Sequence, residues 1–448
     1  MTEPGAPPDA GGLQAWLEKL VQLRPGEARA VSWSFLYFFF LLGSYYVLRP
    51  LRDEMGIAGG TRNLPWLFTA TFLVMLAAVP LYGAVVTRLP RRQFIPLVYY
   101  FFVANIALFW LLLLLDIATV HVARIFFVWT SVFSLFVVSV FWSFLADLYS
   151  AEQSKRLYGF IAAGGSLGAL LGPSVTVAFV ATLGHVNLLL LAGLLLVLAV
   201  LCAGRLEQAA PPRSRDAATT TSGSAAADVE VGGGWLDGFL LLMRSRYLAG
   251  IALWVALLSF AGTFLYYQQA AIVQAASPDP AERTRIFASI ELAVGLLTFA
   301  LQFFATGRLI TRFGTGPALA LLPLVFAAGF VALAASPILA LLIAFQVAQR
   351  TANFAIANPA RESLFTVVAR DEKYKAKNIV DTVLFRGADA VFGWLFEGLR
   401  GVGLGQSGLS LVAAPVCALW LLLALALGRG QQHRASSPSL IPVQPKGA

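Results

Sequence analysis

The chain has 448 residues, of which 58% are hydrophobic and only 12% are charged, and its formal net charge is +9. Soluble domains carry about 25% charged residues, so this composition excludes an ordinary water-soluble fold and predicts an all-α integral membrane protein. The basic residues stand in short segments between apolar stretches. That pattern is typical of orientation signals in a bilayer and not of a nucleic-acid-binding surface.

Apolar stretches of about 20 residues, the length that crosses a bilayer, occur twelve times. They fall near 31–50, 64–87, 93–115, 120–147, 157–182 and 185–204, and then near 248–275, 287–307, 314–335, 337–358, 378–401 and 406–428. The predicted organisation is a cytoplasmic segment 1–30, a six-helix bundle 31–204, a flexible linker 205–235, a second six-helix bundle 236–429 and a disordered tail 430–448.

A short motif recurs at the same place in both halves. Gly-x-x-x-Thr-Arg ends at Arg88 after the second span and at Arg312 after the eighth, each time followed by a proline or glycine within two residues. A basic turn repeated in this way indicates a duplicated six-helix unit. Such a duplication is the plan of an alternating-access transporter.

The distribution of Arg and Lys predicts the orientation. One set of connections holds most of them, together with the linker and both termini, so this side should be cytoplasmic. The N-terminus lacks the features of a signal peptide. Six lysines against 26 arginines suggest a GC-rich bacterial genome. We therefore expect a multi-pass protein of the bacterial inner membrane with both termini in the cytoplasm.

The end of the first span is dense in charge. Arg49 and Arg52 are three residues apart, share a helix face and follow Tyr45. Intramembrane charge costs roughly 2.5–3.5 kcal/mol per residue on insertion scales and needs a reason. Guanidiniums beside aromatic rings suit phosphate or carboxylate, so these three residues are predicted to bind substrate. Alternatively, Arg52 pairs with Asp53 or Glu54 and the group only caps the span.

The second half carries its own intramembrane charges. In the eleventh span Arg386 and Asp389 are three residues apart and are expected to pair. This pair is either scaffold or opens when an anion competes for Arg386, in which case Asp389 is a proton carrier. Glu291, alone in the eighth span, is a second predicted proton carrier or else one half of a structural ion pair.

Polar side chains also mark the seventh and tenth spans. Gln346, Arg350 and Asn353 form one stripe on an apolar helix, which should face protein or a watery cavity. Arg350 is predicted either to bind substrate or to pair with Asp381 or Asp389. Tyr266 and Gln269 are predicted to contact the substrate, although tyrosines also favour membrane interfaces.

Four residues are predicted to form a gate on the cytoplasmic side. Arg88 and Arg312 stand in the repeated turns, where an acid could join neighbouring helices. Asp147 and Glu362, near the ends of the fourth and tenth spans, are the available acids.

Small residues open the fifth span, with Gly164, Gly165 and Gly168 in one short segment. They predict close helix packing. A phosphate-binding loop is the poorer interpretation, because no strand precedes the segment and no Gly-Lys-Ser/Thr follows it.

Other kinds of chemistry find no support in the sequence. His121, His185 and His433 are far apart and have no metal-ligand spacing, and Cys202 and Cys417 lie in different halves. No nucleophile–base arrangement stands out. We therefore expect no metal, no cofactor and no enzyme activity, and we expect a monomer.

Three segments resemble the ATP:ADP antiporters of plastids and intracellular bacteria. The end of the first span, 45–53, is similar to the family pattern Asn-Tyr-x-x-Leu-Arg-Asp-x-Lys-Asp. The strongest match is Trp142-Ser-Phe-Leu-Ala-Asp147 with the following connector through Gly168, and the third is Lys377-Asn-Ile-Val-Asp381. The resemblance implies a major-facilitator fold and a nucleotide-like substrate.

The chain also departs from that family. Arg52 stands where the family has a lysine, the glutamate expected around 129–130 is missing, and the family has a lysine near Asp389. In the repeated turns, Thr87 and Thr311 stand where the superfamily usually has an acid. The resemblance therefore implies a divergent relative.

The predicted function is alternating-access transport of an organic or phosphorylated anion at one central site between the two bundles. One alternative is a proton-coupled carrier of another amphipathic metabolite or a lipid. A second alternative is a membrane scaffold on the same fold that transports nothing.

Overall fold

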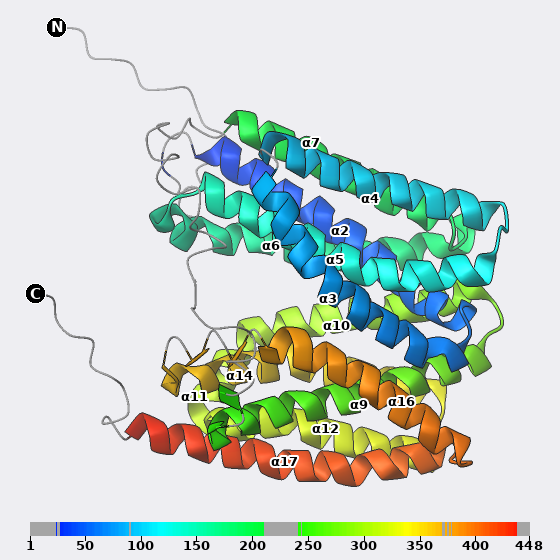
Figure 1. The fold of residues 1–448 in the computed structure, drawn as a ribbon, viewed down its shortest axis with the longest axis vertical. Helices are drawn as coiled ribbons and strands as arrows, with labels where there is room; N and C mark the ends of the chain where they lie inside the picture. The colour runs from blue at the N-terminus through cyan, green and yellow to red at the C-terminus, as the bar shows by residue number, and fades with distance from the viewer. Residues whose placement is uncertain are drawn as a thin grey trace, which may run out of the picture.

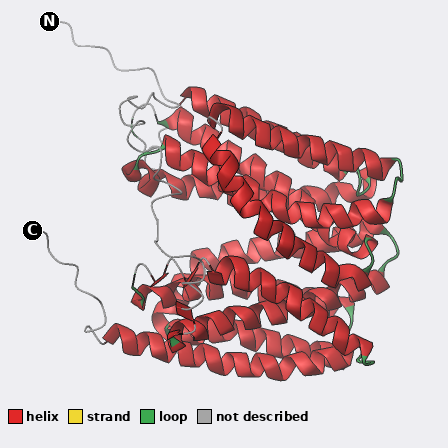
Figure 2. Ribbon diagram, in the orientation of Figure 1, coloured by secondary structure: helices red, strands yellow, loops and turns green. Residues whose placement is uncertain are grey.

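The computed structural model describes residues 24, 27–88, 91–209, 241–242, 244–369, 372–373, 376–377 and 379–436, with the side chains of 79, 81–88, 91–95 and 151 excepted. Most of the predicted linker and the ends of both terminal segments lie outside these residues. Figure 2 shows helices joined by short loops, and the described residues contain no strand.

The first half of the chain forms one helix bundle around its own apolar core. Its helices are α2 (Ala28–Ala58), α3 (Leu64–Arg88), α4 (Arg91–Leu114), α5 (Thr119–Leu148), α6 (Ala151–Leu183) and α7 (Leu188–Ala209), with a single 3-10 turn, η1 (Thr61–Asn63), between α2 and α3. A capping box at Ser150 begins α6: the Ser150 hydroxyl accepts from the Gln153 amide, and the Gln153 side chain accepts from the Ser150 amide.

The second half forms a bundle around another apolar core. It comprises α9 (Arg246–Ala276), α10 (Pro280–Phe304), α11 (Thr306–Phe313), α12 (Thr315–Ala335) and α17 (Gln406–Ser436). The tenth span is α13 (Leu339–Ala352), the π-helix η2 (Asn353–Ala357) and α14 (Asn358–Leu364), followed by the 3-10 turn η3 (Phe365–Val367). The eleventh span is the π-helix η4 (Ile379–Leu384) and α16 (Phe385–Gly401).

Each of the twelve predicted spans corresponds to a helix or to a helix with a π-helical segment. Nine described stretches are long and apolar enough to cross a membrane, and one of them, 152–209, contains both α6 and α7. The remaining predicted spans correspond to α3 and to η4 with α16. Helix α17 continues to Ser436, seven residues into the segment predicted as a tail.

The small residues of α6 allow close contact with α2, as predicted. A Cβ atom added at Gly168 would meet the Phe39 carbonyl oxygen, and one at Gly164 would lie 2.5 Å from the Phe35 carbonyl oxygen. The two backbones therefore approach each other so closely that only glycine fits at these positions.

The two bundles lie side by side, and Figure 1 shows the start of α2 and the end of α17 on the same side of the molecule. We call this the terminus side, where α2 begins and α17 ends, and we call the other the far side. Helix α3 packs against α16 across the boundary, and α10 packs against α2 and α6. Toward the far side, the rings of Trp66 and Trp394 are 4.9 Å apart, and Trp394 Nε1 donates to Thr69 Oγ1 at 3.1 Å. The bundles are therefore joined toward the far side.

Candidate functional site

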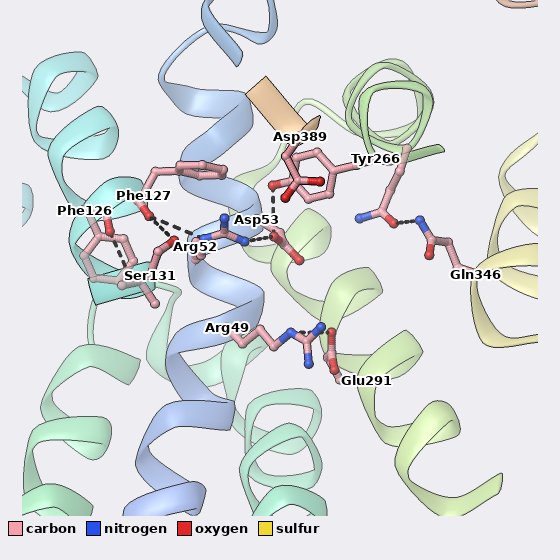
Figure 3. Close-up of polar contacts among 12 residues, drawn as sticks. Arg49, Arg52, Asp53, Phe126, Phe127, Ser131, Tyr266, Glu291, Gln346 and Asp389 are labelled. Atoms are coloured by element: carbon pink, nitrogen blue, oxygen red, sulfur yellow. Dashed lines mark hydrogen bonds and ion pairs between the residues drawn. The ribbon is translucent and has the colours of Figure 1, made fainter. Parts of the chain in front are cut away.

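Two arginines, one from each bundle, meet at Glu291 on α10. Arg350 of α13 contacts both carboxylate oxygens of Glu291, with Nη1–Oε1 at 2.5 Å and Nη2–Oε2 at 2.7 Å. Arg49 of α2 approaches from the other bundle, with Nε 3.2 Å from Oε1. Figure 3 shows Arg49 and Glu291 pointing toward one another. We call these residues the Arg–Glu–Arg triad; with both arginines charged and Glu291 ionised, it carries one net positive charge.

The triad lies near the middle of the membrane-spanning region. Arg49 is nine residues before the far-side end of α2, and Glu291 and Arg350 are eleven residues after the far-side starts of α10 and α13. At 1.5 Å per residue these positions are about 14–16 Å deep, which is half of a hydrocarbon core about 30 Å thick. Substrate sites of secondary transporters lie at this depth.

A cavity of about 180 Å³ between the bundles reaches the triad. Glu291 is one of its lining residues, and Tyr46 of α2 and Phe354 of η2 line it as well. The two rings flank the arginines, with Arg49 Cζ 5.7 Å from the Tyr46 centroid and Arg350 Cζ 5.9 Å from the Phe354 centroid. The lining residue Thr298 has a buried hydroxyl with no hydrogen-bond partner among the described residues. The cavity thus combines aromatic walls, one unpartnered hydroxyl and a charged triad.

Arg52 and Tyr266 meet at a different carboxylate, Asp53. Tyr266 donates its hydroxyl to Asp53 Oδ1 at 3.0 Å across the bundle boundary, and Arg52 Nη1 is 3.4 Å from the same oxygen. The guanidinium of Arg52 also lies over the Phe127 ring, 4.0 Å from its centroid (Figure 3). Of the two acids that the sequence offered to Arg52, the structure pairs it with Asp53.

Glu54 pairs instead with Arg283, a contact that the sequence did not indicate. The pair is bidentate, with Nε–Oε2 at 2.6 Å and Nη2–Oε1 at 2.7 Å, and Arg283 also donates to the carbonyls of Ser277 and Pro278. The Glu54 side chain is 1% exposed. In the sequence, Arg283 stands in a connection between spans and shows no sign of a partner. Only the fold brings it to α2.

The predicted pair in the eleventh span forms, at a distance of 3.8 Å between Arg386 Nη1 and Asp389 Oδ2. The other oxygen, Asp389 Oδ1, accepts from Ser259 at 2.5 Å and from Thr263 at 3.4 Å. Arg386 is 36% exposed, whereas Asp389 is 13% exposed. The aspartate is therefore held by α9, and the arginine is the more accessible partner.

Buried amides connect the seventh and tenth spans. Gln346 donates to Gln269 across the two helices, and Gln349 Nε2 donates to Gln346 Oε1 at 2.9 Å. Arg350 follows this row directly on α13. It pairs with Glu291. The two aspartates considered for it lie against other arginines, Asp381 Oδ1 3.0 Å from Arg361 Nη1 and Asp389 Oδ2 3.8 Å from Arg386 Nη1.

The remaining predicted site residues are more scattered. Tyr45 packs against the core of the first bundle, whereas its neighbour Tyr46 lines the cavity. Glu362 pairs with Lys377 at 2.6 Å, and Arg312 lies 5.7 Å from the Phe313 ring without an ion pair among the described residues. The structure thus places Glu362 and Arg312 in separate contacts. The side chain of Arg88 lies outside the described residues, and the gate role of Arg88 and Asp147 stays a prediction.

Solved structures show what this fold is similar to. The nucleoside transporter NupG matches in two structures. The structure of a point mutant has a TM-score of 0.60 at 14% identity, and the match covers 90% of this chain and 99% of that chain. A second structure has a TM-score of 0.61 at 15% identity, and the match covers 91% of this chain and 99% of that chain. A POT family transporter in complex with 5-aminolevulinic acid matches with a TM-score of 0.61 at 12% identity, covering 90% and 96%.

The sequence itself matches no model of a known protein family and no curated protein. The structural matches cover nearly the whole chain at low identity, so they establish the fold and not the substrate. The chain therefore shares the all-helical membrane fold of these solved transporter structures.

Proposed function

We propose that the protein is a secondary transporter that moves an organic or phosphorylated anion across the bacterial inner membrane by alternating access, with both termini in the cytoplasm. The observation that carries this proposal is the convergence of Arg49 and Arg350, one from each bundle, on one carboxylate beside a cavity at mid-membrane depth. An anion bound there would contact both bundles, as a substrate in an alternating-access mechanism must.

The chemistry of the triad supports an anionic substrate. Guanidiniums bind carboxylates and phosphates through paired, charge-assisted hydrogen bonds. Glu291 already binds Arg350 in this way and forms a single ion pair with Arg49. A substrate anion would replace Glu291 as the partner. The buried amides of Gln269 and Gln346 offer donors and acceptors to the rest of the molecule. The resemblance to ATP:ADP antiporters and the fold shared with the nucleoside transporter NupG favour a nucleotide-like body.

The same competition would couple transport to protons. Protonation of Glu291 removes the negative charge that holds Arg49 and Arg350, so it frees both guanidiniums for the anion. Proton binding and anion binding would then favour each other, as linked equilibria require. Asp389, hydrogen-bonded to Ser259 and Thr263 and 3.8 Å from Arg386, offers a second place for the same exchange.

We propose that the bundles 31–204 and 236–429 rock about this centre. The present structure is joined toward the far side by the Glu54–Arg283 pair and by Trp66 and Trp394. In the opposite state these contacts would separate. The terminus side would then close with the help of the proposed gate residues Arg88, Asp147, Arg312 and Glu362.

The experiment is uptake by proteoliposomes of a panel of labelled nucleotides, sugar phosphates and dicarboxylates, with and without a pH gradient. We expect flux of at least one anion, with loss of that flux in Arg49→Gln and in Arg350→Gln. Arg62→Gln is the matched control, because Arg62 lies in η1 outside the triad. A pH-gradient-driven flux of only neutral amphipathic compounds or lipids would favour the alternative carrier. The absence of any flux, with triad variants that change only stability, would favour the scaffold.

A further inference from the structure

A second hollow lies in the first bundle, away from the boundary between the bundles. It is a groove of about 670 Å³ between α3 and α4, with α5 as its floor. Its surface is apolar along its whole length, and Arg124 of α5, the one charged residue that lines it, borders it with the apolar part of its side chain. This groove plays no part in the proposed transport site.

Small side chains on α3 make the groove. Ala70, Val74 and Ala78 follow one another at intervals of four residues and thus lie on one helix face. Phe101 of α4 and Ile125 of α5 line the other walls, and both are largely exposed, at 59% and 60%. In a membrane protein such an open apolar groove faces the hydrocarbon tails of lipids.

The depth of the groove matches one leaflet. Arg124 is near the far-side start of α5, and the deepest lining residue of that helix is Phe136, twelve residues further on. Twelve residues of helix extend about 18 Å. Half of a hydrocarbon core is about 15 Å thick. The groove therefore begins near the membrane surface and ends near the bilayer centre, as does an acyl chain.

The guanidinium of Arg124 lies beside one end of the groove, where it can meet an anion. Arg124 Nε donates to the Gly59 carbonyl at 2.8 Å, which fixes the guanidinium under the turn between α2 and α3. A Cβ atom at Gly59 would lie only 3.0 Å from Arg124 Cγ, so this glycine makes room for the arginine stem. No acid within the described part of the chain pairs with Arg124, and no described hydrogen bond uses its two terminal nitrogens.

We propose that this groove is a binding site for one anionic phospholipid of the far-side leaflet, with an acyl chain between α3 and α4 and the phosphate on Arg124. The position of Arg124 indicates where the headgroup binds, since this cation lies near the membrane surface, where lipid phosphates lie. The apolar walls and the length of the groove select the chain end.

The test uses delipidated, purified protein in detergent and phosphatidylglycerol as the probe, with binding followed by native mass spectrometry. We expect one tightly retained phosphatidylglycerol per chain. Because one arginine near a membrane surface changes anionic lipid binding about five-fold, Arg124→Gln should weaken retention by about that factor. Glutamine keeps an amide donor for the Gly59 carbonyl. Arg62→Gln, an exposed arginine of the same turn that does not line the groove, should leave retention unchanged.

A second variant tests the chain end independently. Ala78→Phe fills the deep part of the groove and should reduce retention of phosphatidylglycerol and phosphatidylcholine alike. Arg124→Gln should weaken retention of phosphatidylglycerol more than that of the zwitterionic phosphatidylcholine. Equal retention of phosphatidylglycerol by the wild type and both variants would overturn the proposal. The proposal would also be overturned if inorganic phosphate alone stabilised the protein as much as phosphatidylglycerol does, because the site would then bind a phosphate and no acyl chain. The outcome is independent of whether any anion is transported.

Discussion

Substitution of Glu291 by glutamine separates the two roles of the triad. In the wild type, Glu291 accepts from Arg350 at 2.5 and 2.7 Å and lies 3.2 Å from Arg49. Glutamine has nearly the same shape but carries no charge and has only one acceptor oxygen. The variant therefore leaves two guanidiniums beside the cavity without a counter-charge.

Two opposite effects follow, and their sizes can be worked out. Removing one partner of a fully buried ion pair costs about 3–5 kcal/mol of folding free energy. The arginines are 23% and 14% exposed, and Glu291 lines a cavity between the bundles, so we expect a smaller cost of about 2–3 kcal/mol. An anion no longer has to displace a carboxylate from these arginines. Since one charge-assisted hydrogen bond is worth about 1.5–3 kcal/mol, anion affinity should rise at least about ten-fold.

The assay is thermal unfolding in detergent, followed by intrinsic fluorescence, across a concentration series of the anion found in the uptake panel. Glu291→Gln should unfold at a lower temperature without anion and should show the larger stabilisation when anion is added. Its pH-gradient-driven uptake should disappear while exchange continues. Glu397→Gln is the matched control, because Glu397 pairs with Arg400 at 3.4 Å, near the far-side end of α16.

The reasoning is refuted if the glutamine variant unfolds at the wild-type temperature and responds to the anion as the wild type does. It is also refuted if the variant binds anion more weakly, because Glu291 would then belong to the anion site itself and not compete with the substrate.

Three further predictions address other parts of the molecule. Glu54→Gln breaks the bidentate contact with Arg283 and should separate the bundles on the far side. The separation would be measured as a longer distance between spin labels at Thr61 and Gln274. The exchanged pair Glu54→Arg with Arg283→Glu should restore part of the short distance. Glu27 is partly buried, which raises its pKa, but hydrogen bonds from Arg156 and Gln153 outweigh burial and hold the pKa below the usual 4.5. The excess stability of the wild type over Glu27→Gln should therefore be fully present above about pH 4.5 and vanish as the pH falls further, as chemical denaturation at several pH values would show. Gly168→Ala should destabilise the first bundle, since its methyl group meets the Phe39 carbonyl, whereas Gly159→Ala, which meets nothing, should leave thermal stability unchanged.

The positions of the helices could be predicted from the sequence because each apolar stretch has the length of a membrane span. Local pairs were also accessible: Arg386 and Asp389 are three residues apart, and helix geometry alone places them side by side. The close packing of α2 and α6 followed from the glycines of the fifth span.

Contacts between helices that are distant in the sequence could not be predicted in the same way. The partner of Arg350 is Glu291, 59 residues earlier in the chain, and no periodicity within either helix indicates it. Glu54 and Arg283 are 229 residues apart. Tyr45 and Tyr46 show a third limit: neighbouring helical residues point about 100° apart, so the choice of the cavity-lining tyrosine depends on how α2 is rotated in its bundle.

The two bundles differ in a way that bears on how such a transporter would move. In the second bundle a π-helical segment, Asn353–Ala357, interrupts the tenth span, and another, Ile379–Leu384, precedes α16 in the eleventh, whereas their counterparts α5 and α6 are continuous α-helices. Each π segment lies within three residues of an arginine that the proposed site uses, Arg350 in one span and Arg386 in the other. Because a π turn shifts the hydrogen-bond register of a helix, such segments often occur at functional sites. A change in the partner of either arginine can therefore be taken up by the adjacent backbone. On this view the first bundle moves as a rigid body, and the second changes its internal shape when the anion replaces a carboxylate.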